Sequence, residues 1–159
     1  MPSRLRLPFC ACCAAAALLA GCASFVNDDT HPLRIELAQA DGRLVDGAPC
    51  TLIRGAQQIQ VWSGETMPAL RGRDDIHVTC RANGQSEATG TLISRANVGL
   101  AGNIFFGGGV GAIVDHSNAR AYTYPTWVRL VVGETRVYDR RDEVDGQPLL
   151  GQPPTPNKP

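Results

Sequence analysis

Apolar and polar residues alternate in several short stretches between residues 33 and 138. In the first of them, Leu33, Ile35 and Leu37 are separated by single residues and therefore share one face of an extended chain. Similar runs are separated by turn-forming pairs such as Asn83-Gly84, which indicates short strands. The expected strands are 33–38, 50–54, 58–62, 76–81, 87–94, 126–132 and 136–138.

Short strands with turn signals about every eight to twelve residues predict a mainly β fold, a small β-sandwich or barrel, over residues 33–140. Removal of 21 N-terminal residues from the 159 would leave 138. That length is sufficient for one domain with its own core, but not for two.

The first hydrophobic run precedes the strands and has the parts of a secretory signal. Arg4 and Arg6 supply the positive start, and residues 9–20 are uncharged and mostly apolar. A run of about 12 residues is too short for a helix that spans a bilayer, which needs about 20. Residues 1–21 are therefore predicted to be a signal peptide.

Leu19-Ala20-Gly21-Cys22 resembles the lipobox of bacterial lipoproteins. The resemblance implies cleavage before Cys22, a diacylglycerol on its sulfur and an acyl chain such as palmitate on its amine. Residues 22–32 would then be a tether. Ala23 stands where inner-membrane lipoproteins often have Asp, so the resemblance favours the outer membrane, facing the periplasm, with the inner membrane as the alternative. An ordinary secretory signal with an incidental Cys22 is the competing interpretation.

Two of the six cysteines remain once the signal is removed and Cys22 is lipidated. Cys50 and Cys80 both fall on the apolar face of their predicted strands. In an oxidising compartment such a pair is expected to form a disulfide. Two buried free thiols and a metal site are the alternatives, but neither cysteine has the paired spacing of a zinc site.

The charge balance bears on whether the chain binds nucleic acid. Fifteen basic residues match fifteen acidic ones, and loss of Arg4 and Arg6 leaves thirteen basic residues. A nearly neutral chain without a basic run does not indicate a nucleic-acid partner.

Residues 44–86 are similar to the PEGA-like surface-layer repeat. The similarity rests on Val45-Asp-Gly-Ala-Pro-Cys50-Thr-Leu52, Trp62, Pro68, Ile76-His-Val78-Thr-Cys80 and Gly84. It implies a small, immunoglobulin-like β-sandwich.

A second block resembles a family of uncharacterised proteobacterial lipoproteins. It comprises the glycine-rich run from Ala101 to Asp115 and the motif Ala121-Tyr-Thr-Tyr-Pro125. The resemblance implies neither an activity nor a cofactor.

Residues 98–114 carry no charge and are rich in glycine. On a helix, Gly99, Asn103, Gly107 and Gly111 would line one side and allow close approach of another backbone. The segment is predicted to be a helical insertion packed on the sandwich. A membrane-dipping or self-associating segment and a buried glycine-rich strand or loop are the alternatives, because consecutive glycines disfavour a helix.

Candidate catalytic or metal-binding groups are few. Asp115 and His116 are adjacent, but no second histidine or nucleophile motif accompanies them, so a polar turn capped by Asp115 is the favoured interpretation. His31 falls in the predicted tether and His77 on the solvent face of its strand. Scattered histidines do not predict a metal site, and no cofactor is expected.

The aromatic residues gather before the last strands. Tyr122, Tyr124 and Trp127 are expected to pack in the core and at the edge of strand 126–132. A contact patch for a membrane interface, a partner or a glycan is the alternative. Residues 145–159 are rich in proline and are predicted to be a disordered tail.

These features predict a lipid-anchored cell-envelope protein that acts as a non-catalytic binding or structural module. Its partners would be the membrane, through the lipid on Cys22, and an envelope protein or a second copy. The alternative is a membrane-associating assembly subunit that uses the glycine-rich segment. A small hydrolase that uses Asp115 and His116 is the least favoured hypothesis.

Overall fold

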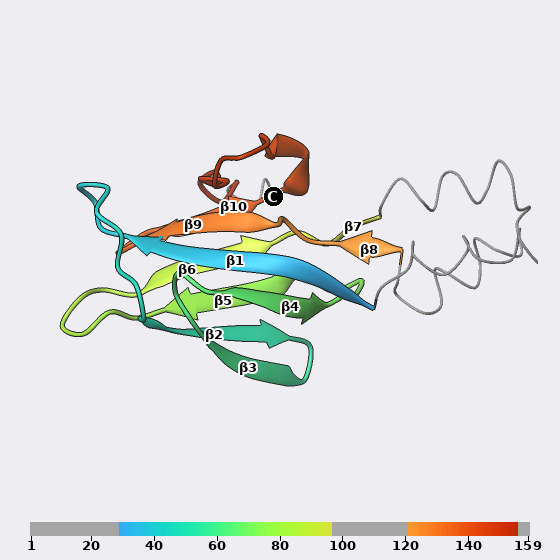
Figure 1. Ribbon diagram of the computed structural model, residues 1–159, viewed down its shortest axis with the longest axis horizontal. Coiled ribbons are helices and arrows are strands. Elements are labelled where there is room, and N and C mark those ends of the chain that lie inside the picture. The colour runs from blue at the N-terminus through green and yellow to red at the C-terminus, as the bar shows by residue number, and fades with distance from the viewer. Residues whose placement is uncertain (1–28, 97–120, 156–159) are drawn as a thin grey trace, which may run out of the picture.

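The computed structural model describes residues 29–96 and 121–155, which are mainly β (Figure 1). Within these residues the helical structure is a single 3-10 turn at Arg140–Asp142. The strands are β1 Thr30–Ala38, β2 Pro49–Arg54, β3 Gln57–Trp62, β4 Thr66–Leu70, β5 Ile76–Cys80, β6 Ala88–Leu92, β7 Arg95–Ala96, β8 Tyr122–Thr123, β9 Trp127–Val131 and β10 Thr135–Tyr138.

The strands form three sheets. A three-stranded sheet has the order β4-β1-β9, a five-stranded sheet has the order β10-β6-β5-β2-β3, and β7 and β8 form a separate pair. The β1–β9 and β6–β10 pairs are parallel and the other pairs are antiparallel. The mainly β class predicted from the alternation is therefore confirmed.

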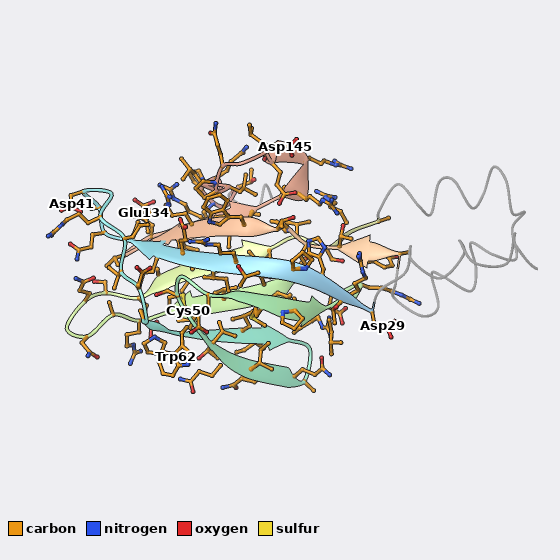
Figure 2. The ribbon with its side chains drawn as sticks, viewed as in Figure 1. Asp29, Asp41, Cys50, Trp62, Glu134 and Asp145 are labelled. Atoms are coloured by element: carbon orange, nitrogen blue, oxygen red, sulfur yellow. A yellow bond between two sulfur atoms is a disulfide. The ribbon has the colours of Figure 1, made fainter. Side chains whose placement is uncertain are left out.

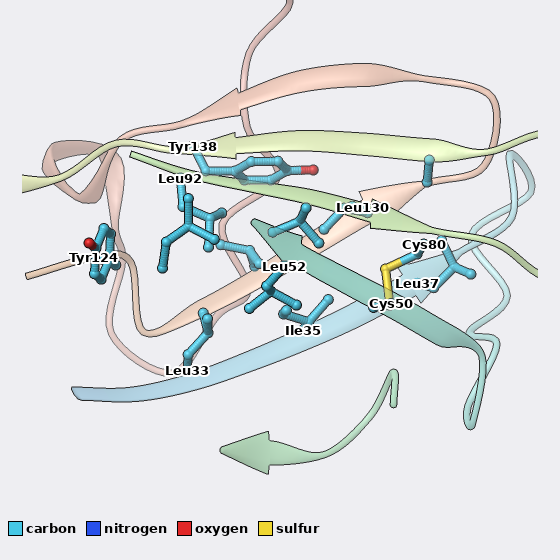
Figure 3. Close-up of a cluster of buried hydrophobic side chains, with 14 of the residues drawn as sticks. Leu33, Ile35, Leu37, Cys50, Leu52, Cys80, Leu92, Tyr124, Leu130 and Tyr138 are labelled. Carbon is cyan, nitrogen blue, oxygen red and sulfur yellow. A yellow bond between two sulfur atoms is a disulfide. The ribbon is translucent and has the colours of Figure 1, made fainter. Parts of the chain in front are cut away.

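The hydrophobic core lies between the two larger sheets (Figure 3). Leu33, Ile35 and Leu37 of β1 face Leu52 and Val78 of the five-stranded sheet, and all five are at most 2% exposed. Burial of each such side chain stabilises the fold by roughly 1.5–3 kcal/mol. The alternating residues of the sequence thus become the inner faces of the two layers.

The ring of Tyr138 is held between two glycines. A Cβ on Gly90 of β6 would lie 2.8 Å from Cε2 of this ring, and a Cβ on Gly151 would lie 2.7 Å from Cε1. The Tyr138 hydroxyl donates a hydrogen bond to the carbonyl oxygen of Arg129 at 2.9 Å. The missing side chains of Gly90 and Gly151 therefore provide the space that this fully buried ring occupies.

Cys50 and Cys80 form the predicted disulfide. They lie directly opposite each other on β2 and β5, with Cα atoms 4.0 Å apart. The Arg81 amide donates to the Pro49 carbonyl, so the two cysteines form a non-hydrogen-bonded pair, the kind in which antiparallel Cα atoms approach closest.

The prediction of a disordered tail from Asp145 is wrong for residues 147–152. Leu149 exchanges backbone hydrogen bonds with Trp127 and Arg129 of β9, at 2.8 and 3.0 Å. Gln152 exchanges two with Val137 of β10, both at 2.8 Å. The proline-rich composition suggested disorder, but Leu149 supplies a buried apolar side chain and the two sheet edges supply hydrogen-bond partners.

Two further boundaries differ from the expectation. The predicted tether 22–32 overlaps β1, which begins at Thr30 and buries His31. Strand β4 is absent from the expected strands; Pro68 at its centre is tolerated because β4 lies at the edge of its sheet. The predicted helical insertion 98–114 lies outside the described residues, which contain no α-helix.

Candidate functional site: an apolar groove between β3 and β4

The two larger sheets leave an opening between them on one side. Residues 147–152 bond to both β9 and β10 and so close the opposite side. β3 and β4 are the other terminal strands, and within 29–96 and 121–155 no further strand pairs with both of them; the short loop 63–65 connects them at one end only. A groove of about 420 Å³ occupies this opening.

The groove is lined mainly by apolar side chains. Leu52 of β2 and Ile76 of β5 form its floor and are almost fully buried. Ile59 of β3 and Leu70 of β4 form its rims and are 46% and 51% exposed. Ile59 lies opposite Leu52 on the inner face of the sheet, yet it remains exposed because the three-stranded sheet ends at β4.

Arg54 closes one end of the groove and connects the two sheets. Its Nη1 donates to the carbonyl oxygen of Leu70 and lies 3.5 Å from the Tyr124 hydroxyl, and its Nη2 donates to Oε1 of Gln57 at 2.7 Å. These three acceptors are uncharged, so no carboxylate among them pairs with the guanidinium at this end of the mainly apolar groove.

The Tyr124 hydroxyl beside Arg54 is itself held by backbone carbonyl oxygens. This hydroxyl lies 2.9 Å from the Asp74 carbonyl oxygen and 3.1 Å from that of Gly72, so it donates to this carbonyl pair. Burial raises the pKa of the Tyr124 phenol, which therefore stays protonated. A Cβ on Gly72 would lie 2.7 Å from Arg54 Nη1 and 3.0 Å from the hydroxyl.

A second polar cluster lies on the outer face of the three-stranded sheet. Glu36 is 3% exposed, and its carboxylate is 2.8 Å from Arg129 Nη2 and 3.2 Å from Arg34 Nη2. The Arg34 guanidinium lies 5.1 Å from the ring centroid of Trp127. The two arginines thus neutralise a buried carboxylate.

The two described histidines lie on different strands, His31 on β1 and His77 on β5. Burial is the main cause that lowers the pKa of His31 to about 4, and the nearby charges of Arg140 and Arg71 add to it. His77 is exposed, as expected, and its Nδ1 lies 3.2 Å from the Thr91 hydroxyl. Within the described residues, no three His, Cys, Asp or Glu side chains are grouped as metal ligands.

The three aromatic residues do not form one surface. Tyr124 is fully buried in the core and cannot contribute to a contact patch, whereas Trp127 packs against Arg34 on the outer face. Tyr122 is half-buried in β8. For Tyr124, packing in the core is confirmed.

The groove itself was not anticipated from the sequence. Ile59 and Val61 were assigned to one face of a strand, but the absence of a facing strand could not be foreseen without β4. Other predicted residues lie outside the described part of the chain and stay predictions: Cys22, Gly99, Asn103, Gly107, Gly111, Asp115 and His116.

No family model, curated protein or solved structure matches the chain. The two family resemblances therefore stay predictions. Across residues 29–96 and 121–155, no helix is both long and apolar enough to cross a membrane.

Proposed function

We propose that the protein is a lipid-anchored cell-envelope module that binds an apolar ligand in the groove between β3 and β4 and catalyses no reaction. The groove is the observation that carries this proposal. Its volume of about 420 Å³ falls in the usual range of ligand pockets, roughly 300–1,000 Å³.

The walls of the groove are held in place before any ligand arrives. The disulfide joins β2 and β5, the two strands that supply the floor. Arg54 connects the end of β2 to the end of β4 through the Leu70 carbonyl. A groove fixed in this way costs a ligand little ordering free energy.

The envelope location rests on the sequence and is supported by the disulfide. Lipobox-like residues 19–22 provide the anchor, and a Cys50–Cys80 bridge is typical of an oxidising compartment such as the periplasm. The two packed sheets fit a small β-sandwich of the PEGA or immunoglobulin type, attached to the outer membrane.

Groove binding is tested with 8-anilinonaphthalene-1-sulfonate, a fluorescent probe that pairs an apolar body with one negative charge. Leu70→Glu should weaken its binding at least tenfold, because the new carboxylate enters the apolar rim. Leu150→Glu is the matched control, because Leu150 is equally exposed (52%) but lies outside the groove. Equal binding by both variants would show that the groove is not the site.

The anchor is tested separately by labelling cells with an alkyne analogue of palmitate. The wild-type chain should incorporate the label and fractionate with the outer membrane. Cys22→Ser should lose both properties, and a labelled Cys22→Ser chain would overturn the assignment.

A further inference from the structure

Three of the four outer edges of the two larger sheets are protected within the described part of the chain. The edges of β9 and β10 are paired with residues 147–152. Covered or blunted edges prevent pairing with other chains, and natural proteins protect exposed strands in this way.

The edge of β4 is protected by Pro68 and Arg54. Pro68 lies opposite Pro32 of β1, and neither residue has an N–H, so the backbone of Pro68 is directed away from β1. At this outer edge Pro68 offers no donor. Two residues further, the outward carbonyl of Leu70 already accepts a hydrogen bond from Arg54.

The edge of β3 has no such protection from any residue in 29–96 or 121–155. Because Cys50 and Cys80 form a non-hydrogen-bonded pair, the backbone N–H and C=O of Cys50 are directed away from β5. They pair instead with the backbone of Val61 on β3. By the same alternation the backbone groups of Gln58 and Gln60 are directed away from β2, toward the free edge at the bottom of Figure 1. The strand Gln57–Trp62 contains neither a charge nor a proline, the residues that usually blunt an edge.

Exposed apolar side chains gather around this same edge. Seven large hydrophobic residues are exposed in the described residues, and four of them lie on β3, on its neighbour β2 or on β4 across the groove: Ile53, Ile59, Trp62 and Leu70. Trp62 lies at the periphery of the molecule in Figure 2. Grouped apolar exposure of this kind marks an interaction surface.

We propose that β3 pairs antiparallel with β3 of a second copy, about a two-fold axis through Gln60. Such pairing joins two five-stranded sheets into one continuous sheet. It satisfies the outward backbone groups of Gln58 and Gln60 in both copies. This proposal goes beyond the groove-binding function and does not depend on it.

The strand is complementary to itself in this register. Ile59 of one copy lies opposite Val61 of the other on the inner face, and Gln58 lies opposite Trp62 on the outer face. β3 itself carries no charge, so no like charges oppose each other in this register. A two-fold contact of this kind uses the same surface in both partners.

The test uses opposite charges at the axis. The full chain is exported with Cys22→Ser to remove the lipid, and its association is followed by sedimentation velocity over a range of concentrations. The chain with an unaltered β3 should form a dimer whose fraction rises with protein concentration. Gln60→Lys and Gln60→Glu should each weaken dimerisation at least tenfold, because like charges then meet at the axis, and an equimolar mixture of the two should recover it as a heterodimer.

Gln85→Lys is the matched control, because Gln85 is an exposed glutamine in the turn after β5. It should dimerise like the wild type, and all variants should unfold at the same temperature. A wild-type chain that stays monomeric, or charge variants that dimerise unaided, would overturn the proposal. Failure of the mixture to dimerise while the wild type does would also overturn the assignment of the axis to β3.

Discussion

Arg129 of β9 lies beside Glu36 of β1 in a parallel strand pair; its Nε donates to Oε2 of the carboxylate at 2.9 Å, and its Nη2 lies 2.8 Å from the same oxygen. The two residues are 93 positions apart in the sequence. Glu36 is buried and Arg129 is partly exposed, so the arginine both neutralises the carboxylate and covers it from water. Charge-assisted pairs with two donors are stronger than neutral hydrogen bonds.

Glu36→Gln should lower the free energy of unfolding by about 2 kcal/mol, because Arg129 and Arg34 lose the charge they pair with. Urea denaturation measures the change. Glu87→Gln, which breaks the exposed pair with Arg81, should cost less than about 1 kcal/mol. Equal losses in the two variants would show that burial adds nothing to the Glu36 pairs.

Stability should fall as the pH drops from 6.5 toward 4. The folded protein lowers the pKa of His31 from 6.5 to about 4, so between these values the unfolded chain binds a proton that the folded chain does not. Above pH 6.5 protonation of His31 does not lower the free energy of unfolding, and by pH 4 it has lowered that free energy by about 3 kcal/mol.

Urea denaturation at several pH values tests the role of His31. His31→Gln should flatten the pH dependence in this window, and His77→Gln, at an exposed position, should leave it unchanged. The carboxyls of Asp41 and Asp139 also have a lowered pKa, but their contribution is lost only below their ordinary value of 3.8. A decline that persists in His31→Gln would assign it to other groups.

Two neighbouring leucines should differ sharply in their effect on stability. Leu149→Ala should cost about 2 kcal/mol or more, because Leu149 is 8% exposed and packs in the core. Leu150→Ala should change stability by less than about 0.5 kcal/mol, because Leu150 is 52% exposed. Similar values from denaturant titrations would mean that residues 147–152 do not seal the two sheets in solution.

Removal of the disulfide should destabilise the domain by about 3 kcal/mol, because the bridge closes a loop between residues 30 positions apart. Cys50→Ala combined with Cys80→Ala should lower the thermal midpoint, and wild type in dithiothreitol should shift in the same direction. A reduced wild type as stable as the oxidised one would contradict this.

The strands could be predicted where one face alone is buried. Leu33, Ile35 and Leu37 alternate with polar residues, and the structure buries them as expected. Glu36 belongs to the polar set, yet it is buried too, because Arg34 and Arg129 cover it from a strand pairing that the alternation does not specify. Periodicity gives the face of a residue but not what lies across from it.

Segments that depend on distant partners could not be predicted. Strand β4 exists because β1 offers hydrogen-bond partners on both sides of Pro68. Residues 147–152 are ordered because β9 and β10 present free edges to them. The groove follows from where both sheets end, which is a property of the strand order and not of any local run of residues.

The placement of β9 beside β1 also sets the order in which the chain can fold. One edge of β1 stays unpaired until Trp127–Val131 is available to it. The two sheets cannot then be joined at β9 and β10 until residue 152 is present. Pairings of such long range make folding slow and leave apolar strands exposed in the meantime. Chains of this protein should therefore bind chaperones until β9 and residues 147–152 have paired.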